Sequence, residues 1–136
     1  MNVEKLTIHP TYKKDNGLWA LDTQNVLPEG VFTPVDQSII WLPARQVAGN
    51  HKHERREALL GIGKAVHFLW QDDKGNVHEE AMNPDDTLYL FVIPPNVPHA
   101  VVNKSPTEPA ILYEYFNDIH RGVERVSLVQ ELDGPQ

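Results

Sequence analysis

Turn-forming residues interrupt this sequence at short intervals, and no other feature limits its possible folds so strongly. The chain contains 11 prolines and 8 glycines in 136 residues. Between them lie short runs rich in β-branched and aromatic residues, and few windows show the spacing of an amphipathic helix. Proline removes a backbone donor and disrupts helix interiors. The pattern therefore predicts an all-β protein built from many short strands.

Nine runs are long enough and regular enough to be expected as strands. They are Gly17–Asp22, Asp36–Leu42, Glu57–Ile62, Ala65–Gln71, Val77–Met82, Thr87–Ile93, His99–Asn103, Ala110–Phe116 and Val123–Val129. The loop 72–76 predicts a hairpin, and one helical turn is expected near Asn117–Gly122. Eight or more short strands at this spacing favour a sandwich or a barrel.

Length and composition define the general class of protein. A chain of 136 residues fits a single domain 1–136, with N-terminal strands or an arm at 1–35 and a barrel core at 36–116 that carries the site residues described below. The absence of cysteine excludes disulfides, thiolate metal sites and a cysteine nucleophile. The formal charge of −7 argues against nucleic-acid binding. Without a signal peptide or a long apolar run, we expect no membrane association and a cytoplasmic location.

Metal-binding residue types cluster just after a glycine-asparagine pair. His51 and His53 lie two residues apart, so on an extended chain both point to one side. Glu57 shares their parity, whereas a regular strand would also turn Arg55 inward, so we expect a turn or bulge around 54–56. A metal would offset the cost of burying these polar groups together. A solvated edge loop is the alternative, and this segment alone leaves both open.

A second segment places a histidine after a rigid turn. His99 follows the sequence Pro94-Pro95-Asn96-Val97-Pro98 and begins an apolar run. Because prolines fix backbone angles, the turn orients His99 in advance. Taken alone, such a histidine is more often an ordinary strand-end residue than a metal ligand.

Together the two segments resemble the paired motifs of the cupin superfamily. The first motif has the form His-x-His-x-x-x-Glu with a later glycine, matched here by His51, His53, Glu57 and Gly61 or Gly63. The second has the form Pro-x-Gly-x-x-His-x-x-x-Asn, matched by Pro94, His99 and Asn103. Asn96 replaces its glycine, and asparagine tolerates a left-handed backbone. The resemblance covers about 36–116 and implies a cupin-type double-stranded β-helix, or jelly-roll, barrel.

The resemblance also implies a metal site and several possible activities. His51, His53, Glu57 and His99 would bind a divalent transition metal, and this ligand set suits Fe, Mn, Ni, Co or Zn. The segment 49–53 is similar to stretches in small cupins of nucleotide-sugar and capsular-polysaccharide pathways, as is Asn117-Asp118-Ile119. This favours a sugar or nucleotide-sugar isomerase or epimerase, using the metal or, as in some enzymes of this fold, cavity histidines alone. An Fe(II)-dependent dioxygenase and a non-catalytic small-molecule-binding protein are the alternatives.

Two further features bear on the site and on assembly. Tyr113 and Tyr115 share one face of a late strand, where a hydroxyl could act as an acid or bind a ligand, although a structural role is favoured. Cupins commonly dimerise, and Val3–Ile8 could add an edge strand to a sheet. We therefore expect a homodimer that binds a small molecule.

Overall fold

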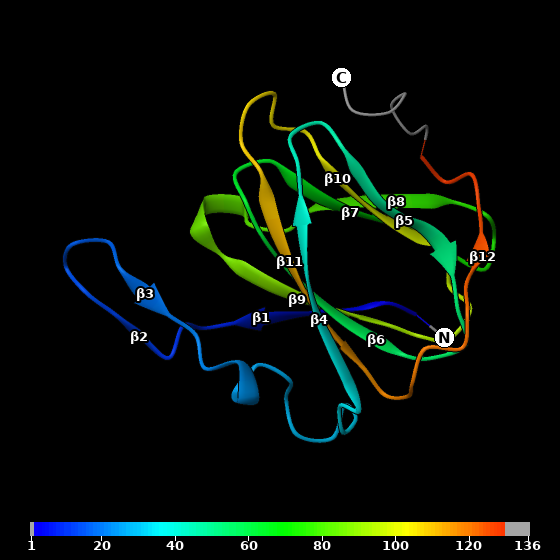
Figure 1. Cartoon of the computed structure of the whole chain (residues 1–136), viewed down its shortest axis with the longest axis horizontal. Helices are drawn as coiled ribbons and strands as arrows, with labels where there is room; N and C mark the ends of the chain where they lie inside the picture. The colour runs from blue at the N-terminus through cyan, green and yellow to red at the C-terminus, as the bar shows by residue number, and fades with distance from the viewer. Residues whose placement is uncertain (1, 130–136) are drawn as a thin grey trace.

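The computed structural model describes residues 2–129, and β-strands dominate it (Figure 1). No helix in this described part is long and apolar enough to span a membrane. The strands are β1 (Glu4–Ile8), β2 (Tyr12–Lys13), β3 (Trp19–Ala20), β4 (Asp36–Leu42), β5 (Val47–Lys52), β6 (Glu57–Ile62), β7 (Val66–Gln71), β8 (Val77–Ala81), β9 (Leu88–Ile93), β10 (His99–Asn103), β11 (Ala110–Phe116) and β12 (Glu124–Arg125). Two short 3₁₀ turns are η1 (Thr23–Asn25) and η2 (Pro84–Asp86).

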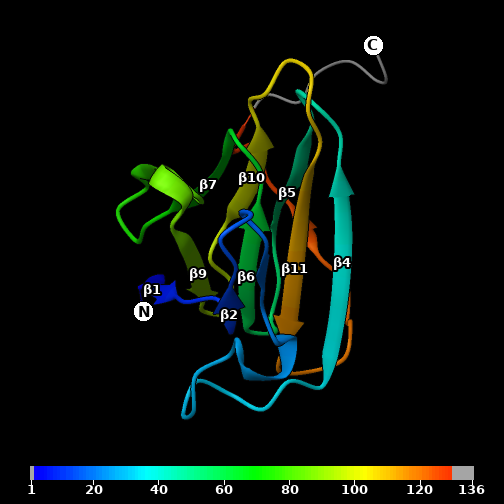
Figure 2. The same cartoon turned by 90° about the vertical axis from the view of Figure 1, so that its left-hand side faces the viewer.

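Two five-stranded antiparallel sheets form the body of the protein (Figures 1 and 2). One has the strand order β1-β9-β6-β11-β4 and the other β12-β5-β10-β7-β8, while β2 and β3 form a separate hairpin. Neighbouring strands come from distant parts of the chain, as in a jelly roll. The predicted all-β cupin-type barrel is confirmed.

The first sheet is covered on its inner face and, over β6 and β9, on its outer face as well. Its inner face meets the second sheet through a cluster that includes Leu59, Phe91 and Leu112. Its outer face carries Leu60 and Leu90 beneath the apolar side chains of segment 21–32. Alternation of side chains along each strand divides β6, β9 and β11 between these two clusters.

Most expected strands are present, and the differences have local causes. The run predicted at Gly17–Asp22 shrinks to the two residues of β3, and the run at Val123–Val129 shrinks to β12. β5 was not among the expected strands, because a glycine and an asparagine interrupt its apolar residues. The helical turn expected near Asn117–Gly122 is wrong: Asn117 Oδ1 instead accepts the backbone N–H of Arg56.

The N-terminal strand covers one edge of the first sheet. β1 pairs antiparallel with β9 of the same chain, from Glu4 opposite Val92 to Ile8 opposite Leu88. The edge strand expected at Val3–Ile8 therefore forms within one chain. On the opposite edge of this sheet, β4 pairs with β11 and with no other strand of residues 2–129.

Candidate metal centre

A bulge in β5 brings the first histidine opposite the third. His51 pairs with His99 while Gly49 pairs with Ala100, so Asn50 is left out of the β5–β10 register. Gly49 and Asn50 both have positive φ angles, 85° and 59°, which glycine and asparagine tolerate best. A side chain at Gly49 would also press on the His99 carbonyl oxygen at 3.1 Å. The Gly49–Asn50 pair thus creates the bulge and allows the β5 backbone to approach the His99 carbonyl closely.

The expected turn at 54–56 separates β5 from β6 and turns Glu57 inward. The chain bends at Glu54 and Arg55, and β6 starts at Glu57. The carbonyl of His53 accepts the N–H of Asn96 at 2.7 Å, which ties this turn to the proline loop before His99. Asn96 has a φ of 62°, the left-handed conformation expected of it. The two motif segments therefore hold each other in place.

Backbone carbonyls fix the orientation of two imidazole rings. His53 Nδ1 lies 2.8 Å from the carbonyl of Arg55, and His99 Nδ1 lies 2.8 Å from the carbonyl of Val97. A carbonyl can only accept, so each Nδ1 carries the proton. In the neutral rings Nε2 then presents a bare lone pair. Such an outer partner is how metal-binding histidines are commonly oriented.

Both lone pairs face the same carboxylate oxygen. Glu57 Oε1 lies 3.0 Å from His53 Nε2 and 3.3 Å from His99 Nε2. The three side chains are buried, with at most 6% of any residue exposed. Three acceptors facing one another at this distance repel unless protons or a cation lie among them. The arrangement is suited to a shared positive ion.

A second buried carboxyl supports Glu57. Burial, together with the charge and hydrogen bond of Glu57, raises the pKa of Glu114 to about 10. Burial opposes the ionisation of Glu57, but its contacts with Glu114, His53 and His99 hold the pKa of this carboxyl well below its usual range. Ser38 Oγ donates to Glu114 Oε1 at 3.0 Å. Glu57 is therefore the anion, and Glu114 the neutral acid that donates to it.

The donor set fits a divalent transition metal. One ligand atom from each of His51, His53, Glu57 and His99 lies within 4.8 Å of the others. Burial, with the nearby His99 and His53, lowers the pKa of His51 to about 4, so its ring is neutral at pH 7. Three neutral imidazoles and one carboxylate suit Fe, Mn, Ni, Co or Zn equally. These are the four residues that the sequence predicted.

The four residues line a cavity of about 300 Å³ between the sheets. Its inner wall is apolar, formed by Ile40, Leu59, Val101 and Leu112. Its other lining residues include the polar or charged Asp36, Ser38, Arg55, Glu114 and His120. This volume is at the small end of ligand-binding pockets. The cavity therefore accommodates a small molecule that is polar on one side.

The segment after β11 contributes to the cavity and is tied to the motif turn. Arg55 donates to Asp36 Oδ2 at 3.0 Å and to the Asp118 carbonyl at 3.3 Å. The guanidinium also lies 3.4 Å from the centre of the Phe116 ring. His120 and Val123, farther along this segment, line the cavity. His120 is exposed and makes no hydrogen bond or ion pair with residues 2–129.

The two tyrosines do not lie in this cavity. Tyr115 donates from its hydroxyl to the Thr23 carbonyl at 2.6 Å, and Tyr113 donates to Gln37 Oε1 at 3.1 Å. Both belong to the outer-face cluster of the first sheet. Glu114, between them, points inward with Leu112 and Phe116. Sequence reasoning missed Glu114, because both faces of β11 carry apolar or aromatic residues and the pattern does not show which face is inward.

Solved structures with this fold include several sugar-nucleotide enzymes. A mutant 3,4-ketoisomerase from Thermoanaerobacterium thermosaccharolyticum, in complex with TDP-4-keto-6-deoxyglucose, matches 88% of this chain and 82% of its own with a TM-score of 0.65 and 15% identity. A 3,4-ketoisomerase from Helicobacter canadensis matches 92% of this chain and 91% of its own, with a TM-score of 0.65 and 19% identity. The TDP-quinovose 3,4-ketoisomerase of Campylobacter jejuni matches 88% of this chain and 87% of its own, with a TM-score of 0.62 and 21% identity.

Comparison of the sequence with known proteins is less informative than comparison of the structure. No protein-family model and no curated protein matches the chain. At 15% to 21% identity the structural matches establish the fold alone. The activity has to be argued from the site.

Proposed function

We propose that this protein binds a divalent transition metal and isomerises or epimerises a small keto sugar or a similar carbonyl compound. The observation that carries the proposal is the convergence of the His53 and His99 Nε2 lone pairs on Glu57 Oε1. The activities of the ketoisomerases with the same fold support the choice of reaction.

His51, His53, Glu57 and His99 would hold the ion. When bound, it supplies Lewis-acid polarisation of a substrate carbonyl, which acidifies the neighbouring C–H. Glu114 and Ser38 keep Glu57 charged and oriented through their hydrogen-bond chain. The apolar inner wall limits the water that can compete with the substrate.

Isomerisation or epimerisation also needs a group that carries a proton between carbon atoms. Among the ionisable lining residues, Asp36 is paired with Arg55, and Glu114 is held by Ser38 and Glu57. His120 makes no hydrogen bond or ion pair within residues 2–129, and it lines the same cavity. Histidine is the side chain best suited to this role near neutral pH. We assign His120 as the proton carrier of the proposed reaction.

Solvent deuterium exchange tests this proposal without requiring the natural product. Metal-loaded protein is incubated in D₂O with TDP-4-keto-6-deoxyglucose and with free keto sugars, and loss of the proton beside the carbonyl is followed by NMR. We expect exchange above the buffer rate with at least one compound, and a decrease of at least tenfold for Glu57→Ala and His120→Asn. Exchange at the buffer rate with every compound would refute the proposed reaction.

The apolar inner wall favours one second candidate, an Fe(II)-dependent dioxygenase. The same ligand set binds iron, and Ile40, Leu59, Val101 and Leu112 would suit an apolar substrate. This candidate predicts oxygen consumption by the iron-loaded protein with aromatic, thiol or diketone substrates. Ligand binding without exchange or oxygen consumption would instead indicate a non-catalytic binding protein.

A homodimer through the outer face of β4 and β11 completes the proposal. Val35, Ile39 and Trp41 are each more than 60% exposed, and Ile111 pairs beside Trp41. The residues on this face carry no charge, so two copies of an acidic chain can meet there without repulsion. The unpaired edge of β4 lies beside it.

A further inference from the structure

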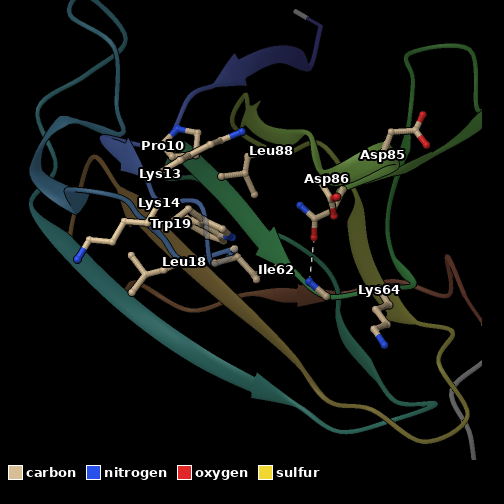
Figure 3. Close-up of a pocket in the computed structure, with 13 residues that line it drawn as sticks. Pro10, Lys13, Lys14, Leu18, Trp19, Ile62, Lys64, Asp85, Asp86 and Leu88 are labelled. Carbon is tan, nitrogen blue, oxygen red and sulfur yellow. Dashed lines mark hydrogen bonds between the residues drawn. The ribbon is translucent and has the colours of Figure 1, made fainter.

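A second pocket, of about 630 Å³, lies between the β2–β3 hairpin and the end of β6 (Figure 3). It shares no lining residue with the metal cavity. Ile62 ends β6 and lines this pocket, whereas Glu57 begins β6 and lines the metal cavity, so the two lie roughly 17 Å apart along the strand. They also point to opposite faces of the sheet. This pocket is therefore separate from the proposed catalytic site.

The base of the pocket is apolar and includes an accessible aromatic ring. Trp19 is 38% exposed and lies beside Leu18, with Ile62 and Leu88 on the barrel side (Figure 3). A large indole left open to a hollow of this size offers a stacking surface for a planar ring. The volume is well within the range of small-molecule sites.

The hairpin supplies the pocket with two lysines, Lys13 and Lys14, that form no ion pair within residues 2–129. Lys13 extends across the pocket towards Leu88, while the Lys14 amine lies at the rim (Figure 3). Four other lysines each have a glutamate partner: Lys5, Lys52, Lys64 and Lys104. On a chain with a charge of −7, two adjacent unpaired lysines favour an anionic ligand.

The wall opposite the hairpin presents acceptors on a rigid support. Asp85 and Asp86 line it and form no ion pair within residues 2–129. Asn83 accepts the N–H of Gly63 at 2.8 Å and donates to the Gly61 carbonyl at 2.8 Å, which fastens this wall to the end of β6. The Asp85 and Asp86 carboxylates are exposed and can accept hydrogen bonds from the hydroxyl groups of a sugar.

We propose that this pocket binds a nucleoside phosphate. The base stacks on Trp19, the ribose hydroxyls donate to Asp85 and Asp86, and the phosphates lie against Lys13 and Lys14. One ligand of this class satisfies the aromatic, acidic and basic groups together, whereas inorganic phosphate would use the lysines alone. The site requires neither the metal nor the proposed reaction.

Isothermal titration of the full chain with UDP, dTDP, ADP and GDP tests this site. We expect one equivalent of at least one nucleotide to bind, with affinity at least tenfold lower in Trp19→Ala and in Lys13→Ala/Lys14→Ala. Lys74→Ala is the matched control, because Lys74 lies in the exposed β7–β8 loop, and it should bind as the wild type does. Trp19, Lys13 and Lys14 are not in the hydrophobic core, so these variants should fold.

Three results would overturn the proposal. The first is no binding of any of the four nucleotides at millimolar concentration. The second is pyrophosphate binding as tightly as the nucleotides, which would indicate a simple anion patch. The third is nucleotide binding that is lost in His51→Ala and unchanged in Trp19→Ala, which would place the nucleotide in the metal cavity. Because deuterium exchange measures the reaction and titration measures this pocket, failure of one is distinguishable from failure of the other.

Discussion

His51 and His99 lie directly opposite each other on β5 and β10 because Asn50 bulges out of the register between them. The Asn50 side chain is buried and holds the C-terminal segment: its Nδ2 donates to the Val129 carbonyl at 2.7 Å, and its Oδ1 accepts the Val129 N–H at 2.9 Å. One residue therefore sets the alignment of two candidate ligands and anchors the segment that follows His120 and Val123.

Two substitutions of Asn50 separate its effect on the alignment of His51 and His99 from its anchoring of the C-terminal segment. Asn50→Gly keeps a residue that tolerates a φ of 59° but loses the side-chain bonds to Val129, so metal content should be retained. Asn50→Val places a β-branched side chain in that conformation, at a cost of about 1–3 kcal/mol, and should lose metal as well as stability. Elemental analysis measures the metal content of the two variants, and urea unfolding measures their stability. Equal metal content in the two variants would show that the bulge does not align the ligands.

Removing the carboxylate at the centre of the site should release the metal. Glu57→Gln keeps the shape of the side chain but removes its charge, so we expect metal affinity to fall at least tenfold by competition titration with a chelator. Chelation of the wild type should lower its melting temperature, because an ion bound only by the folded state stabilises it. His9→Ala, at an exposed position, is the control. Unchanged affinity in Glu57→Gln would remove Glu57 from the site.

Glu114 should be replaceable by an amide but not by an apolar residue. In Glu114→Gln the amide can donate to Glu57 and accept from Ser38, so stability and metal content should stay near wild type. Glu114→Leu removes the buried carboxyl that interacts with Glu57, and the loss of this polar partner should cost about 1–3 kcal/mol. Chemical unfolding of the two variants measures the difference. Equal destabilisation would argue against donation from Glu114.

The β7–β8 hairpin should lose a stabilising interaction in acid. The pKa of Asp72 is lowered to about 2, first by its hydrogen bond with His78 and then by bonds from the Asn76 and Lys74 N–H groups. A carboxyl with a folded pKa below its unfolded value of 3.8 stabilises the fold above that value, and the effect is lost as pH falls towards 2. The stability difference between wild type and Asp72→Asn should therefore shrink from pH 6 to about pH 3 in urea unfolding. A stability difference that stays constant over this pH range would contradict the lowered pKa of Asp72.

A charge placed on the uncharged sheet face should prevent the proposed dimer. Trp41 is 64% exposed at the centre of that face, so Trp41→Glu should leave the fold intact and yield a monomer by light scattering. Val77→Glu is the matched control, because Val77 is 50% exposed on β8 of the other sheet and should leave a dimer. A wild-type monomer, or a dimer in Trp41→Glu, would rule out this interface.

The sequence predicted the ligand positions more successfully than the rest of the cavity. The parity of His51, His53 and Glu57, and the proline turn before His99, depend on local backbone geometry that a pattern can express. The Gly49–Asn50 bulge was missed because it depends on pairing with β10, a strand almost fifty residues away. The inward face of β11 was left open for the same reason, since only the packed sheet decides whether Glu114 or its tyrosine neighbours face the cavity.

The fastening of the two rings by main-chain carbonyls has a consequence for how the protein can change. The Arg55 and Val97 carbonyls are present whatever side chains occupy those positions, so substitution there leaves both imidazoles oriented. Mutations in the surrounding wall can therefore accumulate and alter which molecule fits, while the lone pairs of His53 and His99 stay aimed at the same point. The candidate centre is in this sense robust to mutation, and new substrate preferences are accessible from it by changes in the cavity wall alone.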